Sequence, residues 1–79
     1  MNKQHRLQYA IDHAVSVMVR DIIPGDKVWW TARGGLSRII GTVERVDRVA
    51  GKPGYAFVEL TNGHLTERKY TDTVRLIRE

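Results

Sequence analysis

A Pro-Gly-Asp turn at residues 24–26 leads directly into an apolar, aromatic segment. This change of pattern at residue 24 is the sequence feature that most constrains the fold of the chain. Proline ends a preceding helix because it pushes the residue before it out of the helical region. After the turn the hydrophobic pattern has a period of two, which is typical of strands. Residues 27–32 are predicted as a first strand, with Val28 and Trp30 on one face and Trp29 on the other.

The segment before the turn has a different period. Residues 3–20 contain neither glycine nor proline, and their apolar side chains recur at spacings of three and four. This spacing predicts an amphipathic helix, and its apolar face comprises Leu7, Ile11, Ala14, Val15, Met18 and Val19. Such a helix is not stable alone in water. We therefore expect its apolar face to pack on the rest of the domain, on a second copy of the chain or on another protein.

Four further strands are predicted from alternating apolar residues at 37–47, 55–60, 64–70 and 74–77. The alternation in the long second strand slips between Val43 and Val46, which indicates a β-bulge or a bend. The pair Asn62-Gly63 predicts a type I′ hairpin between the third and fourth strands, because both residues tolerate positive φ. The pattern as a whole predicts a mainly β domain with five strands and one N-terminal α-helix.

Composition narrows the classes of function. The chain has 79 residues, enough for one small domain, and a net charge of +4 from 13 basic and 9 acidic residues. It has no cysteine, which excludes disulfides and thiolate metal sites, and its three histidines (His5, His13 and His64) do not have metal-ligand spacing. No apolar run approaches the ~18 residues of a membrane span. We expect a cytoplasmic protein with no metal and no membrane contact.

Four segments resemble SH3-like barrels of the KOW and Tudor type: residues 25–28, 41–46, 55–60 and 74–77. The resemblance covers about residues 24–78 and implies a five-stranded SH3-like barrel. The chain would then consist of an N-terminal amphipathic helix at 1–23 and a barrel at 24–79. The resemblance implies a binding function, which is nucleic acid for many KOW domains and modified or basic peptide segments for Tudor domains.

A small oligomeric enzyme is a further alternative. The plasmid-encoded dihydrofolate reductases are similar in length and also build an SH3-like barrel, but of their Val-Gln-Ile-Tyr segment residues 67–70 keep only Tyr70. The chain also has no recognisable grouping of nucleophile, base and orienting residue. We therefore expect neither enzymatic activity nor a cofactor.

Basic side chains flank two of the predicted loops, and they make nucleic acid, DNA or RNA, the first expected partner. Cations that neutralise phosphates give binding that weakens steeply with salt. The expected contacts are Arg33, Arg38, Arg45, Arg48, Lys52 and Trp29, with the two loops close enough for five cations to surround the tryptophan. The alternative is a solvated rim in which the cations are interleaved with Glu44 and Asp47, because such alternation of charge is typical of cross-strand charge pairing on a solvent-exposed sheet face.

A protein partner or self-association is the alternative class of interaction. Its expected contacts are the helix face and the exposed aromatic side chains, namely Leu7, Ile11, Val15, Met18, Tyr55, Phe57 and Tyr70. A compact basic chain would also suit a phage or mobile-element accessory protein that blocks a host nucleic-acid machine. The aromatic side chains could instead lie beneath the helix, which needs an apolar surface to pack on.

Overall fold

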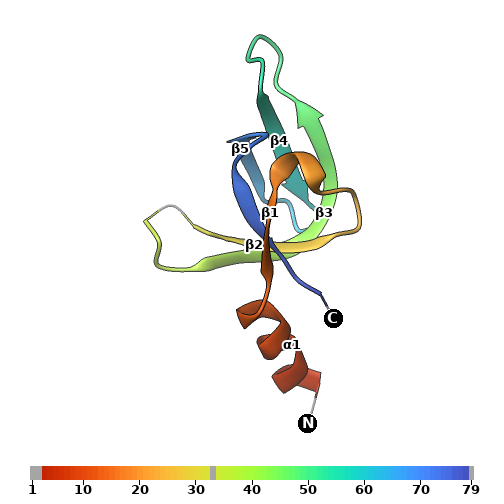
Figure 1. The fold of residues 1–79 in the computed structure, drawn as a ribbon, viewed down its shortest axis with the longest axis vertical. Coiled ribbons are helices and arrows are strands. Elements are labelled where there is room, and N and C mark those ends of the chain that lie inside the picture. The colour runs from red at the N-terminus through yellow and green to blue at the C-terminus, as the bar shows by residue number, and fades with distance from the viewer. Residues whose placement is uncertain (1–2, 33, 79) are drawn as a thin grey trace.

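The computed structural model describes residues 3–32 and 34–78 and shows a mainly β domain with one short helix (Figure 1). Helix α1 (Lys3–Asp12) is followed by strand β1 (Val15–Met18) and the 3₁₀ turn η1 (Val19–Asp21). The strands after Pro24 are β2 (Lys27–Thr31), β3 (Arg38–Arg48), β4 (Tyr55–Leu60), β5 (Leu65–Lys69) and β6 (Thr73–Leu76). Their observed ends agree with the predicted ends to within one residue.

The six strands form one antiparallel sheet in the order β1-β6-β2-β3-β4-β5. Strand β3 joins the two halves of this sheet, because its first part pairs with β2 and its second part with β4. The register shifts between Val43 and Arg45, which confirms the predicted bulge. A bulge bends its strand and increases the local twist, so the two halves of the sheet can face each other across one core.

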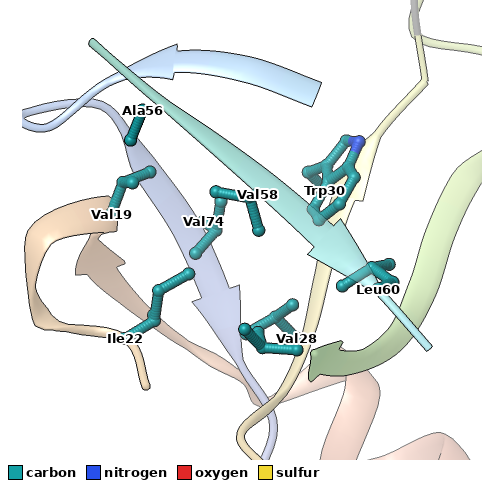
Figure 2. Packing of buried hydrophobic residues seen from close by; sticks show 9 residues of the cluster. Val19, Ile22, Val28, Trp30, Ala56, Val58, Leu60 and Val74 are labelled. Carbon is teal, nitrogen blue, oxygen red and sulfur yellow. The ribbon is translucent and has the colours of Figure 1, made fainter. Parts of the chain in front are cut away.

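Buried side chains from both halves of the sheet meet in this core (Figure 2), which consists of Val19, Ile22, Val28, Trp30, Val43, Ala56, Val58, Leu60 and Val74. The predicted alternation is confirmed in β2, where Val28 and Trp30 are buried and Trp29 lies on the other face. Gly41 lies where β3 passes close to Leu60. A Cβ atom added at Gly41 would be 3.0 Å from Leu60 Cδ1, which explains a glycine in the middle of a strand.

The helix predicted for residues 3–20 is wrong beyond Asp12. Strand β1 pairs with β6 instead, with Val15 opposite Leu76 and Met18 opposite Thr73. Its valines alternate with serine and methionine, and β-branched residues fit a pleated, half-buried surface. The edge of β6 offers backbone partners to such a segment. The expected helical face that joins Leu7 and Ile11 to Val15 and Met18 therefore does not exist.

Helix α1 contacts the rest of the domain through its last turn and extends away from the sheet (Figure 1). Ala10, Ile11 and Ile77 form a second buried cluster, against which Ala14 and Trp29 pack. Leu7, on the same helix, is 45% exposed. The described side chains of α1 that are buried, Ala10 and Ile11, lie in the last turn of the helix. The described part of the chain contains no helix with the length and apolar character needed to cross a membrane.

The β4–β5 turn is not of the predicted type I′. Gly63 has a φ of 93°, but Asn62 does not have a positive φ. The side chain of Asn62 is instead fixed by two hydrogen bonds. Its Nδ2 donates to the carbonyl of Ile40 at 3.0 Å, and its Oδ1 accepts from the backbone N–H of His64 at 3.3 Å. These bonds tie the turn to β3 and leave the left-handed position to glycine alone.

Candidate nucleic-acid interface

The two basic loops lie at different ends of β3. Figure 1 shows the β2–β3 and β3–β4 hairpins pointing in different directions. Arg38 begins β3 and Arg48 ends it, and the strand has 11 residues, which at roughly 3.3 Å per residue keeps its ends far apart. The expectation that five cations surround Trp29 is therefore wrong. Arg33 lies outside the described residues.

The ring of Trp29 is half-buried and already has partners. Its Nε1 donates to the carbonyl oxygen of Ile11 at 2.9 Å. The guanidinium carbons of Arg38 and Arg75 lie 4.5 and 5.9 Å from the ring centroid, within the range of cation–π contacts. The ring thus anchors two arginines and is not an open stacking surface. No local sequence pattern indicates Arg75, because its position beside Trp29 depends on the long-range pairing of β2 with β6.

Arg38 also contacts helix α1. Its Nη1 lies 2.9 Å from Oδ1 of Asp12, which accepts a second hydrogen bond from Gln8 Nε2 at 3.1 Å. The hydrogen bond from Arg38, followed by that from Gln8, holds the pKa of Asp12 below its usual value. Both members of the Arg38–Asp12 pair are exposed to solvent, so the pair adds little stability. It does fix where the guanidinium lies.

Arg45 is surrounded by carboxylates. Its Nε lies 3.1 Å from Oε1 of Glu59, the residue opposite it on β4, and 3.4 Å from Oδ2 of Asp47. The contact with Glu59 is the cross-strand charge pairing that the alternation of acidic and basic residues predicted, whereas Asp47 lies on the same strand as Arg45. Because two acidic groups balance its charge, Arg45 is a poorer candidate for a phosphate contact than the other cations of β3.

The base of the β3–β4 hairpin contains a pocket of about 420 Å³. The pocket is lined by Arg48, Val49, Lys52, Pro53, Gly54, Tyr55 and Tyr70. Backbone hydrogen bonds shape it, because Val49 N donates to Tyr55 O at 3.2 Å and Tyr70 N donates to Gly54 O at 2.9 Å. Two cationic side chains and two aromatic rings therefore converge from the end of β3, the hairpin and the segment after β5.

The two cations of this hairpin pocket differ in their partners. Lys52 Nζ lies 2.8 Å from Oε2 of Glu67 and 4.7 Å from the ring centroid of Tyr55. The hydrogen bond to Glu67 raises the pKa of Lys52. Arg48 is exposed and has no carboxylate partner within the described part of the chain. Its guanidinium is therefore available to an incoming anion.

Arg68 is a further basic residue that sequence analysis did not select. It lies opposite Ala56 on β4, and Arg48 lies opposite the same alanine on β3. Its guanidinium carbon is 5.5 Å from the ring centroid of Trp30, and its Nε is buried without a hydrogen-bond partner. Counting outward from a two-residue Asn62-Gly63 turn would have placed Arg68 opposite Phe57, one residue from the observed register, so the sequence pattern did not indicate the position of Arg68.

The residues expected to bind a protein partner do not form one surface. Leu7 and Ile11 belong to α1, Val15 and Met18 belong to β1, Tyr55 and Phe57 belong to β4, and Tyr70 follows β5. Ile11 is buried against the sheet and Tyr70 packs on the main core. Trp29 is the aromatic residue that packs against the buried cluster of Ala10, Ile11 and Ile77. Phe57 is exposed on the outer face of β4.

Neither a metal centre nor a known relative indicates a function. Among the described residues, no group of three or more histidine, aspartate or glutamate side chains could hold a metal ion. No known protein family, curated protein or solved structure matches the chain. The hairpin pocket and the arginines on Trp29 are two basic features from which a nucleic-acid interface can be inferred.

Proposed function

We propose that this protein is a small, non-enzymatic, cytoplasmic binding module with an SH3-like barrel fold, and that it binds nucleic acid through the hairpin pocket. The bulge in β3 and the single core shared by both halves of the sheet support the barrel. One observation carries the functional proposal: the pocket brings Arg48 and Lys52 beside the rings of Tyr55 and Tyr70.

This combination of groups matches the chemistry of a nucleic-acid strand. Guanidinium and ammonium groups bind phosphate oxygens through charge-assisted hydrogen bonds. Aromatic rings stack on bases, and each such contact is worth about 1–3 kcal/mol by alanine substitution. A single strand exposes both its phosphates and the faces of its bases, whereas a duplex hides the base faces. We therefore favour single-stranded DNA or RNA as the ligand.

The charge of the pocket also argues against the ligand that the Tudor resemblance implies. A methylated lysine or arginine is a cation, and it would have to approach Arg48 and Lys52. Glu67, the acidic group that contacts Lys52, is already engaged by it at 2.8 Å. A cationic peptide would thus meet like charge at this site, while a phosphate would meet opposite charge.

A protein partner is the second candidate, and a different surface favours it. Phe57 and Leu65 lie diagonally across β4 and β5 and are 36% and 58% exposed. Diagonal neighbours on a sheet are within reach of each other, so the two form a small apolar surface. If this surface mediates self-association, Phe57→Ser should lower the mass observed by sedimentation at high concentration, and an unchanged mass would count against it.

The test of nucleic-acid binding is fluorescence anisotropy of labelled single-stranded and duplex oligonucleotides across a salt series. Arg48→Gln should weaken binding and reduce the log–log salt slope by about 0.7, the value for one phosphate contact on a single strand. Arg45→Gln removes the same charge from the same strand and should have a smaller effect, because Glu59 and Asp47 already balance Arg45. Circular dichroism checks that both variants are folded.

The proposal fails in either of two cases. The wild-type protein could show no binding at low salt, which would remove nucleic acid as a direct partner. Alternatively, Arg48→Gln and Arg45→Gln could weaken binding equally, which would show that only net charge matters and that the hairpin pocket is not the contact.

A further inference from the structure

The second feature, Trp29 with its two arginines, forms a basic surface on the opposite end of β3 from the hairpin pocket. Arg75 lies opposite Trp29 in the β2–β6 pairing. On the other side Ile40 lies opposite Trp29, and Arg38 is two residues before Ile40 on β3 and so on the same face of the sheet. The two guanidinium groups therefore approach one ring from both neighbouring strands. Contact with the ring face leaves the N–H groups at the guanidinium edge free to donate to other groups.

An oxyanion already occupies part of this surface. The carboxylate of Asp12 accepts a hydrogen bond from Arg38 Nη1 at 2.9 Å. Arg75, by contrast, has no carboxylate partner among the described residues. A carboxylate and a phosphate are recognised by the same guanidinium edge. Asp12 thus shows that Arg38 is oriented for an oxyanion, and Arg75 offers a second cation beside it.

The position of Asp12 is unfavourable for its own helix. It is the last residue of α1, where the helix dipole places partial negative charge, and no basic residue lies in the last turn. A carboxylate at this end costs stability, so the helix alone does not account for it. Contact with Arg38 and Gln8 compensates for this cost in the structure.

Helix α1 is also attached in a way that allows displacement. It has 10 residues, fewer than the 12–15 or so that an isolated helix needs to be even marginally stable. Its described buried contacts are limited to Ala10 and Ile11, which pack with Ile77 and Trp29. The salt bridge to Arg38 is exposed. A phosphate that replaced the carboxylate would therefore have little binding energy to overcome.

We propose that Arg38 and Arg75, held on Trp29, form a second phosphate-binding site, and that Asp12 occupies this site until nucleic acid displaces it. The inference rests on the proposed function and adds to it a contact and a built-in competitor. Asp12 reduces affinity for the ligand by neutralising Arg38. The last turn of α1 thereby links nucleic-acid binding to the docking of the helix.

A double-mutant cycle tests the competition. Anisotropy with a labelled single-stranded oligothymidine is measured for the wild-type protein, Asp12→Asn, Arg38→Gln and the double variant at one low salt concentration. Asp12→Asn should bind about two- to fivefold more tightly, the effect of releasing one exposed ion pair. In the Arg38→Gln background the same change should give a much smaller gain. Asp47→Asn is the matched control, because it removes an equal charge beside Arg45.

Arg75→Gln is the second test, and it leaves both members of the Arg38–Asp12 pair in place. It should weaken binding more than Arg45→Gln and lower the salt slope by about 0.7. The inference is overturned if Asp12→Asn gives the same gain with and without Arg38 and if Arg75→Gln matches Arg45→Gln. The proposed function survives that result as long as Arg48→Gln still weakens binding. A wild-type protein that binds no oligonucleotide overturns both.

Discussion

The indole Nε1 of Trp29 donates a hydrogen bond to the carbonyl oxygen of Ile11 at 2.9 Å, so a side chain of the sheet caps the end of helix α1. The last four carbonyl groups of a helix have no partner within the helix. Capping one of them from β2 therefore adds to the packing of Ala10 and Ile11 on Ile77 in holding the helix end against the sheet. The same ring carries Arg38 and Arg75, so helix docking and the position of both cations depend on one residue.

The first prediction concerns this cap. Trp29→Phe keeps an aromatic ring for the arginines but removes the N–H donor, which should destabilise the docked helix by about 1 kcal/mol. Hydrogen exchange of the backbone amides around His13 should become faster, while amides of β4 should change little. Equal exchange in both proteins would show that the hydrogen bond to Ile11 does not hold the helix.

The second prediction concerns the core. Leu60 is fully buried, and Leu60→Ala should cost about 2–5 kcal/mol because it removes apolar contacts and leaves a cavity. Leu65→Ala makes the same chemical change at a position that is 58% exposed and should shift stability by no more than about 0.5 kcal/mol. Urea unfolding followed by circular dichroism measures both. Similar losses in the two variants would contradict the observed assignment of the core.

The third prediction concerns Gly41. A methyl group there would lie 3.0 Å from Leu60 Cδ1 and 3.1 Å from Asn62 Nδ2. We expect Gly41→Ala to cost about 1–3 kcal/mol in unfolding free energy, as overpacked sites do, because the strand or the β4–β5 turn must move. A thermal melt with unchanged midpoint would show that this approach is looser than the structure describes.

The fourth prediction concerns pH. The pKa of Asp12 is lowered from its usual 3.8 by the hydrogen bond from Arg38, so this contact stabilises the folded state above that value. Its contribution is lost as the pH falls through the lowered pKa of the folded state. Asp12→Asn should therefore show a smaller loss of α1 protection between pH 5 and pH 2 or so than the wild-type protein does. Identical pH profiles in hydrogen exchange would mean that the Arg38–Asp12 pair does not form in solution.

Local patterns predicted most of the sheet. The alternation in β4 fixed the inward positions of Ala56, Val58 and Leu60, and the slip after Val43 marked the bulge, because each depends on neighbouring residues alone. The β4–β5 turn was predicted at the right place, but its type depends on a hydrogen bond from Asn62 to Ile40 on another strand. A single sequence contains no local signal for that contact.

The N-terminal segment and the site were less accessible to prediction. The residues of Val15–Met18 fit both a helical and an alternating pattern. They form a strand because the edge of β6 provides backbone hydrogen-bond partners for it. The hairpin pocket is lined by Arg48 and Lys52, which were predicted to contact nucleic acid, and by Tyr55 and Tyr70, which were predicted to contact a protein partner. Both pairs were identified from the residues, but their convergence depends on the course of the chain after β5, which residue types alone do not specify.

The pairing of β1 with β6 has a consequence for biosynthesis. Val74 completes the main core, and Ile77 completes the cluster under α1. Until both have left the ribosome, the nascent chain can form the local β3–β4 and β4–β5 hairpins but cannot close its core. The joining of segments so distant in the chain is the slow, entropically costly step. The two buried clusters can therefore close only after β6 and Ile77 have been synthesised.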